Sequence, residues 1–159
     1  MHEIREWFEG PLALSGAIAN GRSVAAAEML GADLAYIGSA FIATEEANAS
    51  AAYKDATTRS GAEDIVYTNL FTGVHGNYLR QSIVNAGLDP LQLPASDPTK
   101  MNFGSGREKE VKAWRDIWGA GQGLRAVKSV VPAREYIERL AREYAAARAA
   151  VAQPAWAAR

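Results

Sequence analysis

Residues 11–41 read PLALSGAIANGRSVAAAEMLGADLAYIGSAF, and this stretch decides the fold class. Two short apolar runs, Leu12–Ser15 and Leu34–Ile37, are each followed by a glycine, Gly16 and Gly38. The alanine-rich segment between the runs carries its apolar residues at helical spacing. Strand, helix and strand in this order form a βαβ unit, in which the two strands are parallel. The stretch therefore predicts an α/β fold.

The two glycine turns form a candidate anion site. Parallel neighbouring strands end at the same edge of a sheet, so both turns bring free backbone N–H groups to one place. Such groups bind phosphate in α/β proteins. The expected donors are the backbones of Gly16, Ala17, Ile18, Gly38 and Ser39, together with the Ser39 hydroxyl. The alternative is that the glycines only permit tight turns.

Composition limits the possible functions. The chain has 159 residues, fewer than the roughly 250 of a complete (β/α)₈ barrel. Its formal net charge of -1 gives no electrostatic case for nucleic acid. It has no cysteine and only two histidines, which argues against disulfides, thiolate catalysis and a histidine-rich metal centre. No run approaches the ~20 apolar residues of a membrane span, and the first residues do not resemble a signal peptide. We therefore expect a cytoplasmic protein without a membrane partner.

The rest of the chain divides into three expected regions. Residues 1–60 hold the βα units, residues 61–106 form a lid-like insertion with an irregular proline-rich loop, and residues 107–159 form C-terminal helices. Within them we predict helices at 45–58, 77–86, 107–118 and 132–151, a strand at 64–70, and a glycine turn at 119–123. Ile137, Leu140, Ala141 and Tyr144 are the expected buried face of the last helix.

Two motifs carry a family resemblance. Gly16-Ala17-Ile18-Ala19-Asn20-Gly21-Arg22 and Ile37-Gly38-Ser39-Ala40-Phe41 resemble, in order and spacing, two segments of the nitronate monooxygenase (2-nitropropane dioxygenase-like) family. The blocks DIVYTNLFTGVHGNYLR and WGAGQG are similar to one branch of that family. The resemblance covers nearly the whole chain and points to the C-terminal portion of such enzymes.

The resemblance implies a partial FMN-dependent TIM (β/α)₈ barrel consisting of its last two βα units and a C-terminal helical region. It implies that the ends of the seventh and eighth strands hold the FMN phosphate. The cofactor-binding candidates are Ser15, Gly16, Ala17, Ile18, Gly38, Ser39 and Ala40. It also implies that the N-terminal strands and the family's catalytic histidine precede this chain, with Met1 standing inside a helix.

The remaining catalytic candidates are weak. His75 lies between Gly73 and Gly76 and could act as an acid, a base or a substrate contact, but we favour the alternative that it caps a following helix. Gln122 lies in the GAGQG turn, and family members often carry a Gly-Gln pair near the flavin; the alternative is an ordinary loop residue. Neither residue has a recognisable partner in the sequence, so the catalytic group stays unassigned.

Three functions follow from this interpretation. The first is oxidation of alkyl nitronates by FMN and O₂, with a nitronate as the small-molecule substrate. The second is an FMN-dependent enoyl-thioester reductase. The third is a non-catalytic half-barrel remnant or interaction module. A half-barrel exposes sheet edges, so we expect either a homo-oligomer or a complementing N-terminal half as partner.

Overall fold

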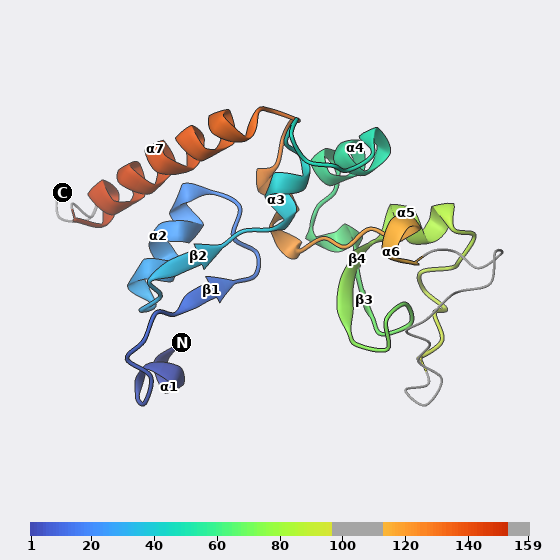
Figure 1. Cartoon of the computed structure of the whole chain (residues 1–159), viewed down its shortest axis with the longest axis horizontal. Coiled ribbons are helices and arrows are strands. Elements are labelled where there is room, and N and C mark those ends of the chain that lie inside the picture. The colour runs from blue at the N-terminus through green and yellow to red at the C-terminus, as the bar shows by residue number, and fades with distance from the viewer. Residues whose placement is uncertain (97–112, 153–159) are drawn as a thin grey trace, which may run out of the picture.

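The computed structural model describes residues 1–96 and 113–152 of the chain. Its α-helices, 3₁₀ helices (η) and strands follow in chain order (Figure 1). They are α1 (His2–Arg5), β1 (Ala13–Ser15), α2 (Gly21–Met29), β2 (Leu34–Tyr36), α3 (Ser39–Ile42), α4 (Ala51–Arg59), η1 (Ala62–Asp64), β3 (Ile65–Thr68), β4 (Gly76–Leu79), α5 (Arg80–Asn85), α6 (Ala113–Asp116), η3 (Gln122–Ala126) and α7 (Ala133–Ala152).

The βαβ unit has the architecture that the sequence predicts. β1 and β2 pair in parallel, with Ala13 opposite Leu34. α2 connects them and is capped by Asn20, whose side chain accepts a hydrogen bond from the backbone N–H of Ser23 at 2.8 Å. Asparagine satisfies an otherwise unpaired N–H at this position, so the helix start is defined by the sequence itself. The α/β fold class is therefore confirmed, whereas two short parallel strands are only part of a barrel.

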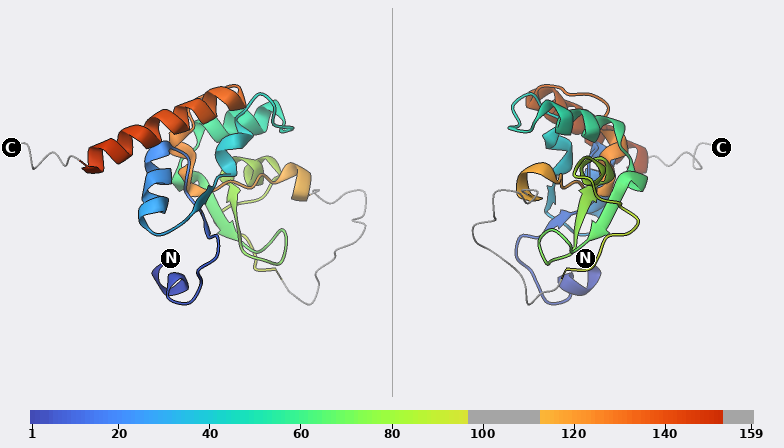
Figure 2. Two further views of the ribbon diagram at one scale, coloured as in Figure 1. Left: turned by 60° about the vertical axis from the view of Figure 1, so that its left-hand side comes forward. Right: turned by 90° about the vertical axis from the view of Figure 1, so that its right-hand side faces the viewer.

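The long helix α7 lies along α2 on one side of the β1–β2 pair (Figures 1 and 2). Gly21 is buried at this contact, where an added Cβ would overlap the backbone of Leu140 and Tyr144. The Gly21 N–H also donates to the Glu143 carboxylate at 2.8 Å. A residue without a side chain thus lets the two helices approach closely.

The buried face of α7 is rotated from the predicted one. Tyr136 and Ala147 are buried, whereas Ile137 is 53% exposed and Ala141 is also exposed. Helical spacing alone leaves neighbouring stripes nearly equivalent, and the contact with α2 selects the stripe that contains Tyr136 and Leu140.

The segment after β3 differs from its prediction. Residues 76–79 form strand β4, antiparallel to β3 with Ile65 opposite Leu79, and a helix begins only at Arg80. The predicted helix over 77–86 is therefore wrong in its first turn. Pairing with β3 and burial of Leu79 determine the strand, and both depend on contacts that are distant in sequence.

Two apolar clusters form the core. One gathers Ala19, Ala40, Ala43, Val127 and Tyr136 between the βαβ unit and α7. The other gathers Ala56, Leu79, Ala120 and Leu124 between α4, β4 and η3. The first cluster packs Ala19 and Ala40, which follow the two glycine turns, against Tyr136 of α7.

The sheet face away from α2 is open. Ala13, Ser15, Leu34 and Tyr36 point to this face, and all are exposed in the described chain. Parallel strands in proteins are normally covered on both faces. We call these four residues the open sheet face.

Parts of the predicted regions lie outside the described residues. These are the end of the proline-rich loop at 97–106 and the first part of the helix predicted at 107–118, of which α6 is described. Within residues 1–96 and 113–152, no helix combines the length and apolar character needed to cross a membrane.

Candidate anion-binding site

The two glycine turns and two distant segments line one open cavity of about 300 Å³. It lies at the carboxyl ends of β1 and β2, where α/β proteins commonly bind ligands. Its lining residues come from both turns, from β2 and β4, and from the loop before and within η3. They are Ser15, Gly16, Ala17, Ile18, Ala19, Tyr36, Gly38, Ser39, Ala40, Asn77, Gly121 and Gly123. All seven predicted cofactor-binding residues thus meet in one place.

The β1–α2 turn has an unusual backbone. Gly16 has φ of 105° and Ala17 has φ of 54°, so both residues adopt positive φ. An L-residue such as Ala17 adopts this conformation only where its surroundings hold it. Tyr136 donates from its hydroxyl to the Ala19 carbonyl at 3.2 Å, and Gly123 packs so closely that its added Cβ would lie 2.9 Å from the Ala17 carbonyl oxygen. These contacts stabilise the backbone conformation of the β1–α2 turn.

The β2–α3 turn presents Gly38 and Ser39. Gly38 has φ of −107°, which any residue can adopt, and an added Cβ at Gly38 meets nothing within 4 Å. Neither the backbone nor packing within the described chain therefore requires glycine here. An added Cβ at Gly16 also meets nothing within 4 Å. Both turns leave space where a ligand could contact the backbone.

Among the described residues, the Ser39 hydroxyl acts as a hydrogen-bond acceptor and is free to donate into the cavity. Its oxygen accepts the backbone N–H of Gly121 at 2.7 Å. The hydroxyl hydrogen then remains available to donate, because no acceptor for it occurs among the described residues. Ser39 can thus donate to an anion while its own orientation is fixed from the other side.

The third wall of the cavity is the segment 118–123. Leu79 donates its N–H to the Trp118 carbonyl at 2.8 Å, and Ala120 donates to the Asn77 carbonyl at 3.1 Å. These bonds place the segment beside β4 like a short additional strand. We call residues 118–123 the glycine strap.

The electrostatics of the cavity suit an anion. The lining residues include no carboxylate and no cationic side chain. Within the described part of the chain, the backbone N–H groups of Ala17, Gly38 and Ser39 donate no hydrogen bond. Unpaired N–H groups in a cavity without acidic side chains favour a negatively charged group. Among the same residues, no cluster of histidine, aspartate and glutamate could hold a metal ion.

Neither of the two catalytic candidates is among the residues that line the cavity. His75 is exposed before β4 and stacks on Tyr67 at a ring-centroid distance of 5.0 Å. Gln122 is exposed on the glycine strap, between the lining residues Gly121 and Gly123. Among the described residues, neither side chain forms a hydrogen bond with the predicted anion-binding residues.

Five residues that line the cavity were not among the candidates predicted from the sequence: Ala19, Tyr36, Asn77, Gly121 and Gly123. The glycine pattern of the strap was the one local signal for the last two. Tyr36 and Asn77 reach the cavity through strand pairing and had no recognisable motif.

Comparison with known proteins identifies the family. The model of the family described as nitronate monooxygenase matches residues 1–143. The chain belongs to the nitronate monooxygenase family. A nitronate monooxygenase of Paraburkholderia phytofirmans is 30% identical over 139 residues, covering 84% of this chain and 37% of that protein. A probable nitronate monooxygenase of Staphylococcus saprophyticus is 40% identical over 123 residues, covering 74% of this chain and 34% of that protein.

Solved structures share the fold of this chain. A nitroalkane oxidase from Streptomyces ansochromogenes has a TM-score of 0.71 at 31% identity, with 93% of this chain and 43% of that chain covered. FabK from Thermotoga maritima, as its M276A mutant, has a TM-score of 0.67 at 20% identity, covering 94% and 46%. The chain therefore spans about a third of these curated relatives and less than half of these solved structures.

Proposed function

We propose that this chain supplies the FMN phosphate-binding part of an enzyme that oxidises alkyl nitronates with O₂. The observation that carries the proposal is the convergence of both glycine turns on one cavity at the carboxyl ends of two parallel strands. Membership of the nitronate monooxygenase family supports the reaction class.

The residues of the cavity fit a phosphate group. Gly16 and Gly38 leave open space at the backbone, the turns offer unpaired N–H groups, and Ser39 offers a hydroxyl donor. In this proposal Ala17, Gly38 and Ser39 hold the phosphate by neutral donors rather than by charge. FMN, when bound, supplies the redox chemistry, and the protein orients it.

The proposal assigns no catalytic residue to the described chain. His75 stacks on Tyr67, and neither His75 nor Gln122 is among the residues that line the cavity. No observation favours the enoyl-thioester reductase over nitronate oxidation, because the likeness to FabK, at 20% identity, bears on the fold alone.

We further propose that another polypeptide segment carrying parallel strands covers the open sheet face. Leu34 and Tyr36 are 61% and 66% exposed there, which is unusual for a parallel sheet. The relatives are about three times longer than the matched region and so have sequence for such a segment. In this proposal the same segment also carries the catalytic group, because none is assigned among the residues that the structure describes.

Flavin titration of the full chain tests the phosphate site. FMN and riboflavin differ only by the phosphate, so we expect quenching of flavin fluorescence to give an affinity at least about tenfold higher for FMN, as charge-assisted hydrogen bonds imply. Equal affinities would refute a phosphate site in the cavity. Uptake of neither flavin would instead favour a non-catalytic module.

A reconstitution assay tests the open sheet face and the reaction together. The N-terminal part of a full-length relative is added to the chain with FMN, and O₂ consumption is followed with an alkyl nitronate. We expect Leu34→Lys to abolish the reconstituted activity. Met29→Lys is the matched control, because Met29 is similarly exposed, at 56%, but lies on α2. Equal loss in both variants would argue against the proposed face.

A further inference from the structure

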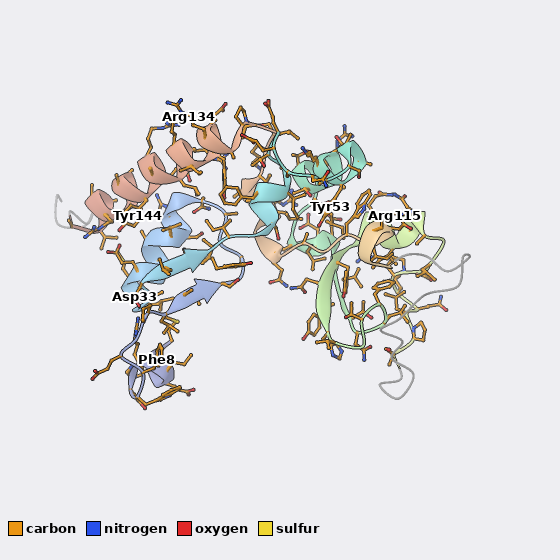
Figure 3. The ribbon with its side chains drawn as sticks, viewed as in Figure 1. Phe8, Asp33, Tyr53, Arg115, Arg134 and Tyr144 are labelled. Atoms are coloured by element: carbon orange, nitrogen blue, oxygen red, sulfur yellow. The ribbon has the colours of Figure 1, made fainter. Side chains whose placement is uncertain are left out.

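Tyr53 of α4 contacts the glycine strap at two of its residues, Trp118 and Gly119. Figure 3 labels Tyr53. Its hydroxyl donates to the Gly119 carbonyl, and its ring stacks on Trp118 with ring centroids 5.1 Å apart and planes 10° apart. Burial raises the pKa of Tyr53 to about 12, so the hydroxyl stays protonated and able to donate at neutral pH. Tyr53 itself does not line the cavity.

The glycine strap that Tyr53 holds also contacts the cavity. Two residues beyond Gly119, the Gly121 N–H donates to the Ser39 hydroxyl oxygen at 2.7 Å. Another two residues on, Gly123 packs against the backbone of Ala17. The strap therefore contacts both glycine turns, and its position determines how Ser39 and Ala17 face the cavity.

We propose that Tyr53 is a positioning residue for the anion cavity. By holding Gly119, it keeps the Gly121 N–H aimed at the Ser39 hydroxyl, and so directs the hydroxyl hydrogen toward the anion. This inference rests on the proposed function, because it assigns a supporting residue to the same phosphate site. The inference adds to the proposed function a side chain that lies outside the cavity and affects the affinity for the anion.

The substitution Tyr53→Phe tests the proposal with little disturbance of packing. The ring that stacks on Trp118 remains, and only the hydroxyl is removed. The matched control is Tyr144→Phe, which removes a hydroxyl that donates to Glu28 at 2.7 Å between α7 and α2, away from the cavity (Figure 3).

The first measurement is amide hydrogen exchange of the full chain without ligand. We expect faster exchange at Gly121 and Ala120 in Tyr53→Phe, with unchanged exchange in α7, because the strap alone loses an anchor. Tyr144→Phe should leave the strap amides unchanged. Unchanged exchange at Gly121 in Tyr53→Phe would overturn the proposal.

The second measurement is affinity for FMN, riboflavin and inorganic phosphate. We expect Tyr53→Phe to bind FMN and phosphate about fivefold more weakly, the effect of one hydrogen bond, with riboflavin unaffected. Unchanged FMN affinity beside faster Gly121 exchange would reduce Tyr53 to a structural residue and overturn the proposal. A wild-type chain that binds neither FMN nor phosphate would instead refute the proposed function, and the role of Tyr53 with it.

Discussion

The Gly121 backbone N–H donates to the Ser39 hydroxyl oxygen across 82 positions of sequence. This single bond joins the glycine strap to the β2–α3 turn and fixes which way the hydroxyl can donate. It makes Ser39 the side chain on which the proposed phosphate site depends most directly.

Replacing Ser39 with alanine should weaken FMN binding by about tenfold or more. The variant loses the hydroxyl donor to a charged group and leaves the Gly121 N–H unpaired beside the cavity. Flavin fluorescence titration measures the effect, with riboflavin as the ligand that should not respond. Ser23→Ala is the control, because Ser23 lies on α2 outside the cavity lining. Equal weakening in both variants would contradict a specific role for Ser39.

The substitution Gly38→Ala should lower the affinity for FMN without lowering the stability of the fold. The backbone φ of −107° tolerates alanine, and the new methyl group meets nothing within 4 Å in the protein. We therefore expect a free energy of unfolding within about 0.5 kcal/mol of wild type, but lower FMN affinity because the methyl group enters the cavity. Urea unfolding and flavin titration measure the two quantities. Unchanged FMN affinity would mean that no ligand approaches the Gly38 backbone.

Gly16→Ala offers the contrasting case. Its φ of 105° is unfavourable for alanine, although space is available. We expect a loss of about 1 kcal/mol or more in unfolding free energy, measured in the same urea experiment. A stability equal to that of Gly38→Ala would show that the turn relaxes.

The sequence was sufficient for some of these features and insufficient for others. The parallel strands, α2 and the two glycine turns follow from local patterns, since Asn20 caps the helix and Gly16 permits the turn. β4 could not be recognised, because Asn77 to Leu79 form a strand only through pairing with β3. The glycine turn at 119–123 was predicted, but its place beside the cavity was not. Gly121 and Gly123 reach the cavity through contacts with Ser39 and Ala17, which are distant in sequence.

Gly21→Ala should strongly destabilise the fold. The added Cβ would overlap backbone atoms of Leu140 and Tyr144, which cannot rotate away as a side chain can. We expect a loss of about 2 kcal/mol or more in unfolding free energy, as for overpacked interiors. Gly119→Ala is a suitable control, because its nearest new contact is the Asn77 carbonyl oxygen at an ordinary 3.7 Å. Similar stability of the two variants would contradict the close approach of α2 and α7.

Asp33 should contribute a stability that depends on pH. A hydrogen bond from the Leu12 backbone N–H, followed by one from the Arg5 side chain, lowers the pKa of Asp33 below its usual 3.8. Its contribution is therefore present above pH 3.8 and is lost as the pH falls through the lower pKa of the folded state. Urea unfolding between neutral and acid pH should show a wild-type advantage over Asp33→Asn that shrinks toward the acid end. A difference in unfolding free energy that does not change with pH would contradict the lowered pKa of Asp33.

Gly21 and Glu143 meet across 122 positions of sequence, and Tyr136 holds Ala19 across 117. A ribosome makes the glycine turns long before it makes α7. Until α7 emerges, α2 has no partner for its tightly fitted face, and the β1–α2 turn lacks its supporting hydroxyl. The anion cavity is therefore assembled late in synthesis, so nascent chains halted before residue 136 should lack the site that their own N-terminal residues encode.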